Sequence, residues 1–297
     1  MSAIVVTRGL GKQYRRRWAL RDCSLQIPEG RVTGLVGPNG AGKTTLLGLA
    51  VGILTPTVGT IEVCGGRPAA DSAQLAKVGF VAQDTPTYAG LTVAEHLRLG
   101  AHLNPSWDDA AARRRIDRLG LHPRTKAGQL SGGQRAQLAL TLGLAKRPEL
   151  LVLDEPVASL DPLARREFLQ VLMEAVADDG ISVLLSSHVV SDLERVCDHV
   201  VVLVESQVRV SGDVDELLAT HHRLSGPHRE PATLPADQHV VWASQTDRQS
   251  TYVVRTESPI IDPAWAVDAL GLEDLVLAYM SATASPSLPG PALEVLR

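Results

Sequence analysis

A glycine-rich segment near the N-terminus has the residue types and spacing of a phosphate-binding loop. It follows an expected strand, precedes an expected helix and fits the pattern G-x-x-x-x-G-K-[ST]. Glycines let the backbone amides turn toward phosphates, and the helix N-terminus adds partial positive charge. We expect Lys43 to reach the β- and γ-phosphates of a nucleotide, and Thr44 to offer its hydroxyl to Mg²⁺. The segment reads Gly37-Pro38-Asn39-Gly40-Ala41-Gly42-Lys43-Thr44-Thr45.

A second chemically useful feature is the apolar run 150–153, which ends in the carboxylates Asp154 and Glu155. Asp154 is expected to hold Mg²⁺, directly or through water. Glu155 is expected to polarise the water that attacks the terminal phosphate. Acidic residues are common at strand ends, so this pair gains its meaning from the phosphate-binding loop.

The third feature is the pentad Leu130-Ser131-Gly132-Gly133-Gln134. Ser131 and Gln134 have the S-x-x-Q spacing of a capping box, which satisfies free amides at the start of a helix. Two glycines after the cap are unfavourable, because each costs roughly 1 kcal/mol relative to alanine in a helix. They are understandable if a phosphate approaches the backbone closely. One nucleotide needs one phosphate cradle, so a second cradle predicts a nucleotide held between two subunits.

Short β-rich runs alternating with helical segments must position these residues. Runs 182–185 and 200–203 are continuously apolar, like 150–153, and helices are expected at 162–176 and 189–196 between them. Buried strands alternating with helices predict an α/β core with parallel central strands. Further expected strands cover residues 3–8, 24–36 (broken by a turn at 28–30), 61–63 and 78–82, and further helices cover 44–52 and two segments within 92–121 separated by Pro105.

The composition changes after residue 220. Residues 221–236 hold prolines and histidines with few large apolar side chains, and predict a linker in which the histidines are exposed rather than metal ligands. Residues 237–282 predict a small C-terminal domain, with two short strands and a helix at about 271–282. Residues 283–297 are rich in proline and serine and predict a mobile tail.

The bulk properties exclude several classes of protein. The 297 residues carry a formal net charge of −4, so no basic field favours nucleic acid as a partner. The three cysteines are widely separated and predict neither a disulfide framework nor a zinc site. No signal-peptide pattern and no apolar stretch of about 20 residues is found, so we expect any membrane role to run through a partner.

Residues 1 to about 220 resemble the nucleotide-binding subunit of an ATP-binding cassette (ABC) transporter, because the three motifs occur in that superfamily's order. The resemblance implies a P-loop NTPase fold: a RecA-like lobe, an antiparallel β subdomain and a helical subdomain at about 84–148. A small C-terminal α+β extension would follow. It also implies hydrolysis of MgATP by in-line attack of water. Two copies would hold two ATP molecules, each between one subunit's phosphate-binding loop and the other's pentad.

The resemblance also assigns roles to single residues. Tyr14 stands where an aromatic ring stacks on adenine, with Trp18 as a nearby alternative. Gln83 stands where a glutamine meets Mg²⁺ and the attacking water, and senses the membrane partner. Asp161 belongs to a loop that crosses the dimer interface, and His188 resembles a histidine that contacts the γ-phosphate. The implied catalytic residues are Glu155, His188 and Gln83, and the implied metal ligands are Thr44, Gln83 and Asp154.

Several short segments resemble bacterial ATPases of the ABC-2 type, which commonly export drugs or natural products. The chain would then lie on the cytoplasmic face of the membrane as a homodimer, bound to a separately encoded permease that docks at residues 84–107. Val157 replaces a common threonine, with no loss of a catalytic group. Alternatives are an importer subunit, which often has a larger C-terminal domain, or a soluble ABC ATPase acting on ribosomes or DNA, which usually has two cassettes or a coiled-coil insertion. The segments are 83–86, 103–105 and 271–275.

Overall fold

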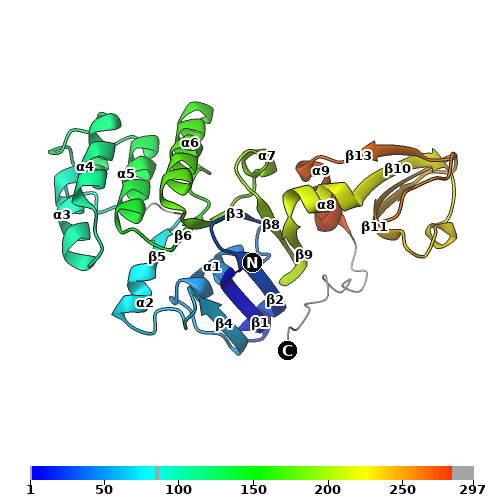
Figure 1. Ribbon diagram of the computed structural model, residues 1–297, viewed down its shortest axis with the longest axis horizontal. Helices are drawn as coiled ribbons and strands as arrows, with labels where there is room; N and C mark the ends of the chain where they lie inside the picture. The colour runs from blue at the N-terminus through cyan, green and yellow to red at the C-terminus, as the bar shows by residue number, and fades with distance from the viewer. Residues whose placement is uncertain (1, 84–86, 283–297) are drawn as a thin grey trace.

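Three β-sheets organise the chain, of which the computed structural model describes residues 2–83 and 87–282 (Figure 1). The largest sheet has the order β5-β6-β7-β3-β8-β9, in which only β9 runs antiparallel to its neighbour. All residues of the four central strands are buried, as expected for apolar strands covered on both faces. The predicted α/β core is confirmed. Its strands are β3 (Val32–Val36), β5 (Val78–Val81), β6 (Leu150–Asp154), β7 (Ser182–Ser186), β8 (His199–Val204) and β9 (Gln207–Asp213).

An antiparallel sheet of order β2-β1-β4 lies beside this core. It consists of β1 (Ala3–Tyr14), β2 (Arg17–Pro28) and β4 (Val58–Val63). The helix α1 (Lys43–Ala50) packs its leucines between this sheet and the parallel one. The first strand is longer than the predicted run at residues 3–8. The added residues are mostly polar or glycine, and they are held by cross-strand pairing rather than by local β-propensity.

A separate group of helices packs around its own apolar cluster, on the left of Figure 1. It contains α3 (Val93–Leu103), α4 (Asp109–Arg118) and α5 (Gly132–Ala145), so the predicted helix pair around Pro105 is confirmed. The short helix α2 (Ser72–Lys77) precedes β5. After β6 come α6 (Pro162–Asp179) and α7 (Val190–Leu193), which is shorter than the predicted helix at 189–196. No helix in residues 2–83 or 87–282 is long and apolar enough to cross a bilayer.

The chain after residue 213 forms α8 (Val214–Thr220) and a four-stranded antiparallel sheet of order β11-β12-β10-β13, followed by α9 (Leu272–Ser281). The prediction of a linker is wrong for residues 221–227, which form an inner strand of this sheet. Their hydrogen bonds to β12 and β13 are non-local, so the small and polar side chains gave no local signal. The strands are β10 (His221–Pro227), β11 (His239–Gln245), β12 (Gln249–Arg255) and β13 (Ala266–Ala269). Residues 283–297, predicted as a tail, lie outside the described residues.

His221 also differs from the expected exposed loop histidine, because it is fully buried. Its Nδ1 lies 2.7 Å from the Leu217 carbonyl oxygen, and its Nε2 lies 2.8 Å from the Tyr279 hydroxyl. Burial lowers the pKa of His221 to about 4. The neutral ring therefore joins β10 to both α8 and α9.

Helix α9 packs on the parallel sheet and α7 rather than standing apart from them. Leu272, Leu275 and Val276 are fully buried in the same apolar cluster as Leu193 of α7 and Val200 of β8. Figure 1 shows α9 beside α7 and α8, between the parallel sheet and the C-terminal sheet. Residues 272–281 therefore share a core with the parallel sheet.

This shared core predicts a large loss of stability for Leu275→Ala. The side chain is fully buried, so its removal is expected to lower the free energy of unfolding by about 2–5 kcal/mol. Leu277→Ala on the same helix is the matched control, because Leu277 is 48% exposed and its loss should change stability by less than about 0.5 kcal/mol. Urea unfolding would measure both. A loss confined to a second transition, with the main transition unchanged, would contradict the shared core.

Candidate functional site

The glycine-rich loop is held by close contacts that side chains could not replace. Gly42 caps α1 in the left-handed region, with φ of 112°, and a Cβ there would lie 2.4 Å from the Ala19 carbonyl oxygen. A Cβ on Gly37 would lie 2.1 Å from the Leu203 carbonyl oxygen. Lys43 curls back over the loop, and its Nζ donates to the Gly37 carbonyl oxygen at 2.8 Å. The buried Lys43 ammonium group thus holds the first residues of the loop through their backbone carbonyl groups.

A cavity of about 640 Å³ lies between this loop and the hairpin that joins β1 to β2. The structure brings together there most of the residues predicted from the sequence. Tyr14 and Trp18 both line the cavity, so either ring is placed to meet a base. Sequence reasoning missed Arg17 and Ala19, because it ended the first strand before the hairpin. The other lining residues are Asn39, Gly40, Gly42, Lys43, Thr44, Thr45, Gln83, Glu155 and His188.

Glu155 lines the cavity and contacts two of its other lining residues. Its Oε1 is 3.7 Å from Lys43 Nζ, and its Oε2 is 3.2 Å from His188 Nδ1. The residue has a φ of 46°, a left-handed conformation that is uncommon for a non-glycine residue. The carboxylate therefore sits between a buried cation and an imidazole, within reach of a substrate held by the loop.

Asp154 is held behind Glu155 rather than in the cavity lining. It is buried, and its Oδ1 accepts a hydrogen bond from the Ser186 hydroxyl at 2.7 Å. The Ser186 oxygen in turn accepts from the backbone N–H of Glu155 at 2.8 Å. Ser186 was missed in the sequence analysis, although it is the polar last residue of β7. It ties together the carboxyl ends of β6 and β7.

The donor set suits a magnesium ion that is bound mainly through phosphates. Thr44 and Gln83 line the cavity, and the buried Asp154 is joined through Ser186 to Glu155, which also lines it. In the described part of the chain no group of three or more Asp, Glu, His or Cys side chains could hold a metal alone. Mg²⁺ usually keeps several waters and takes only one or two protein carboxylates beside substrate phosphates. The residues present therefore fit Mg²⁺ that arrives with a nucleotide.

The pentad does not line this cavity. Its Leu130 is buried in the cluster of helices α3, α4 and α5, whereas Ser131, Gly132 and Gln134 are exposed. The capping box is formed: Gln134 N–H donates to Ser131 Oγ at 3.2 Å, and Ser131 N–H donates to Gln134 Oε1 at 3.0 Å. A Cβ on Gly132 would meet no atom within 4 Å. Packing within the chain thus gives no reason for glycine at this position.

Asp161 and Gly133 complete the predicted set outside the cavity. Asp161 caps α6, with its Oδ1 accepting from the N–H groups of Leu163 and Ala164, both at 3.0 Å. A Cβ on Gly133 would lie 3.1 Å from the Ala164 Cβ, so the start of α5 passes close to the start of α6. These two helix starts form one exposed edge of the molecule.

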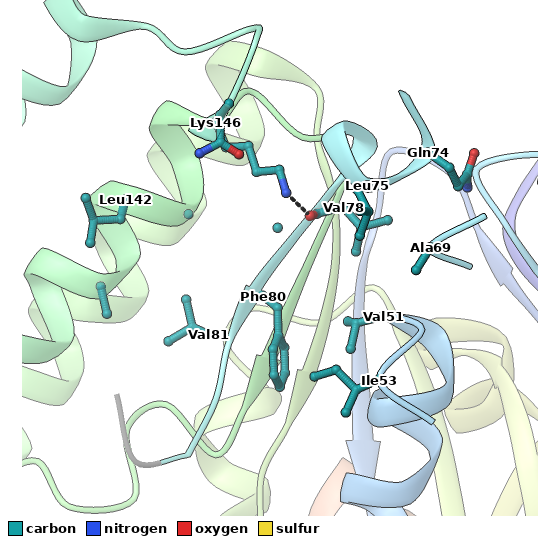
Figure 2. A pocket seen from close by; sticks show the side chains of 14 residues that line it. Val51, Ile53, Ala69, Gln74, Leu75, Val78, Phe80, Val81, Leu142 and Lys146 are labelled. Carbon is teal, nitrogen blue, oxygen red and sulfur yellow. Dashed lines mark hydrogen bonds between the residues drawn. The ribbon is translucent and has the colours of Figure 1, made fainter. Parts of the chain in front are cut away.

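A second hollow, of about 330 Å³, lies between the end of α1, α2, β5 and α5 (Figure 2). Apolar side chains line it, including Phe80 of β5 and Leu142 of α5. Ile53 and Leu75 are 68% and 49% exposed at its rim. Lys146 donates to the Val78 carbonyl oxygen at 2.8 Å across one end, and burial lowers the pKa of this amine. Of the expected docking stretch 84–107, Asn104 lines the hollow, and residues 84–86 lie outside the described residues.

The chain is similar to ATP-binding proteins of ABC transporters. A family model described as "ABC transporter" matches residues 20–158. The chain is 34% identical to the uncharacterized ABC transporter ATP-binding protein YxlF of Bacillus subtilis, over 70% of this chain and 70% of that protein. It is 30% identical to the bacitracin transport ATP-binding protein BcrA of Enterococcus faecalis, over 73% of this chain and 71% of that protein.

The chain is also similar to an import ATP-binding protein and to a solved structure. The sulfate/thiosulfate import ATP-binding protein CysA 1 of Agrobacterium fabrum is 35% identical, over 73% of this chain and 65% of that protein. A solved structure of the ATP-binding subunit of an ABC transporter is similar with a TM-score of 0.65 and 28% identity, over 72% of this chain and 91% of that one.

Proposed function

We propose that this chain, which belongs to the ABC transporter family of ATP-binding proteins, powers export of a drug or natural product through a separately encoded permease. ATP binding and hydrolysis are the activity of this family. The observation that carries the drug-export proposal is the similarity to BcrA, which is named for transport of bacitracin. Import is the second candidate, favoured by the similarity to CysA 1.

In this proposal the cavity beside the glycine-rich loop is the ATP site. Lys43 and the loop amides would bind the phosphates, with Tyr14 or Trp18 against the base. Thr44, Gln83 and Asp154 would hold Mg²⁺, which neutralises phosphate charge when bound. Glu155 would polarise the attacking water, and His188 would contact both Glu155 and the terminal phosphate. The contacts of Glu155 with Lys43 and His188 support this arrangement.

Cassettes of this family work as dimers attached to membrane permeases. We infer a homodimer in which the exposed edge formed by Ser131–Gln134 and Asp161 faces the ATP site of a second copy. Three observations support this inference: the pentad lies outside its own cavity lining, it is exposed, and Gly132 has open space around it. The start of α5 would then offer its free amides to phosphates bound by the other subunit.

The apolar hollow shown in Figure 2 is the proposed docking site for the permease. Residues of β5 line it, and this strand ends two residues before Gln83, so a segment seated in the hollow would contact the strand that leads to a residue of the ATP site. Its exposed Ile53 and Leu75 give an apolar rim for a cytoplasmic helix of a membrane protein. This placement would hold the chain at the cytoplasmic face of the membrane.

Inside-out membrane vesicles that contain the chain and its co-purifying permease would test export. We expect MgATP to drive accumulation of a drug in the vesicle lumen. Ile53→Glu should abolish membrane attachment and accumulation, because a docked apolar segment would bury the new charge at the rim of the hollow. Ile261→Glu is the matched control, since Ile261 is 89% exposed and does not line the hollow.

The outcomes separate the two parts of the proposal. ATP-driven release of a solute from preloaded vesicles, without accumulation, would identify an importer and overturn the export assignment. Parental membrane attachment of the Ile53→Glu variant would instead overturn the docking site and leave the direction of transport as measured.

A further inference from the structure

The charged side chains in the lining of the ATP site leave one cation without a partner. Lys43 and Glu155 face each other at 3.7 Å, and their side chains are only 6% and 14% exposed. Arg17 also lines the cavity. Within residues 2–83 and 87–282 its guanidinium takes part in none of the hydrogen bonds or ion pairs that the structure forms. Among the described residues, the lysine and the glutamate offset each other, whereas Arg17 adds a positive charge that has no acidic partner there.

A tight hairpin fixes Arg17 beside the loop. Arg17 begins β2 and is the register partner of Tyr14, the last residue of β1. The two turn residues between them include Arg15, with φ of 55°. Arg17 Nη2 lies 4.0 Å from the position of a Cβ on Gly40, in the middle of the phosphate-binding loop. The Arg17 side chain therefore reaches from the hairpin, which carries Tyr14, to the glycine-rich loop.

We propose that Arg17 binds the phosphate chain of ATP; this inference rests on the proposed ATP site. A guanidinium presents its donors in a rigid fork that matches phosphate oxygens and can donate two parallel hydrogen bonds. It stays charged at every physiological pH. Lys43 already contacts backbone carbonyl groups and Glu155, whereas Arg17 has no such contact among the described residues, so its guanidinium offers further donors to an incoming phosphate chain.

The test compares ATP affinity of the full chain with those of Arg17→Gln and Arg16→Gln, measured by calorimetry. Arg16→Gln is the matched control, because it removes the same charge from the same hairpin. Arg16 is exposed and does not line the cavity. We expect Arg17→Gln to weaken ATP binding by about tenfold or more, the effect of losing a hydrogen bond between charged groups, and Arg16→Gln to have little effect. Arg17→Lys should recover part of the loss, since it keeps the charge without the fork.

The salt dependence of ATP affinity shows whether Arg17 contacts the phosphates or the base. The difference between Arg17→Gln and Arg16→Gln should shrink when salt rises from about 50 mM to about 500 mM, because the contact joins opposite charges near solvent. A difference that does not change with salt would place the guanidinium on the base and overturn the phosphate assignment. Equal thermal unfolding temperatures without nucleotide would show that the hairpin remains folded.

Failure of this inference is distinct from failure of the ATP site. If the parental chain binds ATP, Lys43→Ala weakens binding and Arg17→Gln behaves like Arg16→Gln, the assignment of Arg17 is wrong and the site stands. If the parental chain does not bind ATP, or if Lys43→Ala binds ATP as tightly as the parental chain, the proposed site falls, and the role of Arg17 falls with it.

Discussion

Glu155→Gln is expected to lower ATP turnover by about 10²–10⁴-fold while ATP binding stays intact, the range for removal of a general base. Glutamine keeps the size of the side chain and one carbonyl oxygen, but it cannot take a proton from water. The loss of the negative charge beside Lys43 should not weaken binding, because Lys43 then has no acidic neighbour competing with phosphate. We therefore expect the variant to accumulate as a dimer that retains ATP.

Release of inorganic phosphate and retention of radiolabelled ATP on gel filtration would measure the two effects. Glu230→Gln is a suitable control, because it removes the same charge from an exposed side chain outside the cavity. Turnover of Glu155→Gln at the parental rate would show that another group activates the water. Loss of ATP binding would show that the Glu155 contacts with Lys43 and His188 are needed to build the site.

Ser131→Arg is expected to abolish hydrolysis with little change in the ATP affinity of the monomer. An arginine side chain at this exposed helix start would displace the contact between the pentad and the phosphates bound by the second subunit, whereas the cavity that binds ATP lies elsewhere in the chain. The lost cap costs about 1 kcal/mol, too little to unfold a domain of ordinary stability. Equal loss of ATP affinity in the isolated monomer would contradict action across a dimer.

Mixing two inactive variants gives a sharper form of this test. A dimer of one Ser131→Arg chain and one Lys43→Ala chain has one intact site, built from the loop of the first and the pentad of the second. Random pairing in equal amounts makes half of the dimers mixed, so about a quarter of the parental rate should return if the sites act independently. A mixture that forms mixed dimers and still stays inactive would contradict the shared site.

The local structure of several segments of the candidate site could be predicted from the sequence. The glycine loop, the ends of the parallel strands and the capping box are fixed by residues next to each other in the chain, so their motifs carry their geometry. The central strands were recognised because all of their residues are buried and each contains a continuous apolar run. Local pattern and final environment agree at these positions.

The remainder depended on partners distant in the sequence. The hairpin that places Arg17 continues through glycine and polar residues, so its strands could not be read from apolar alternation. Strand β10 is similar: it has one large buried apolar residue, Leu224, and is held by pairing with both β12 and β13. His221 read as a polar loop residue because its partner, Tyr279, lies 58 residues away. Non-local contacts decided each of these cases.

The position of α9 has a consequence for synthesis of the protein. Leu272, Leu275 and Val276 fill an apolar surface of the parallel sheet and α7, which are made much earlier. The chain emerges from the ribosome N-terminus first, so every ATP-site residue emerges before α9 covers this surface. Until α9 emerges, the nascent chain presents an uncovered apolar face and is exposed to aggregation. We therefore expect chains halted before residue 272 to require chaperones, even though their ATP-site motifs are complete.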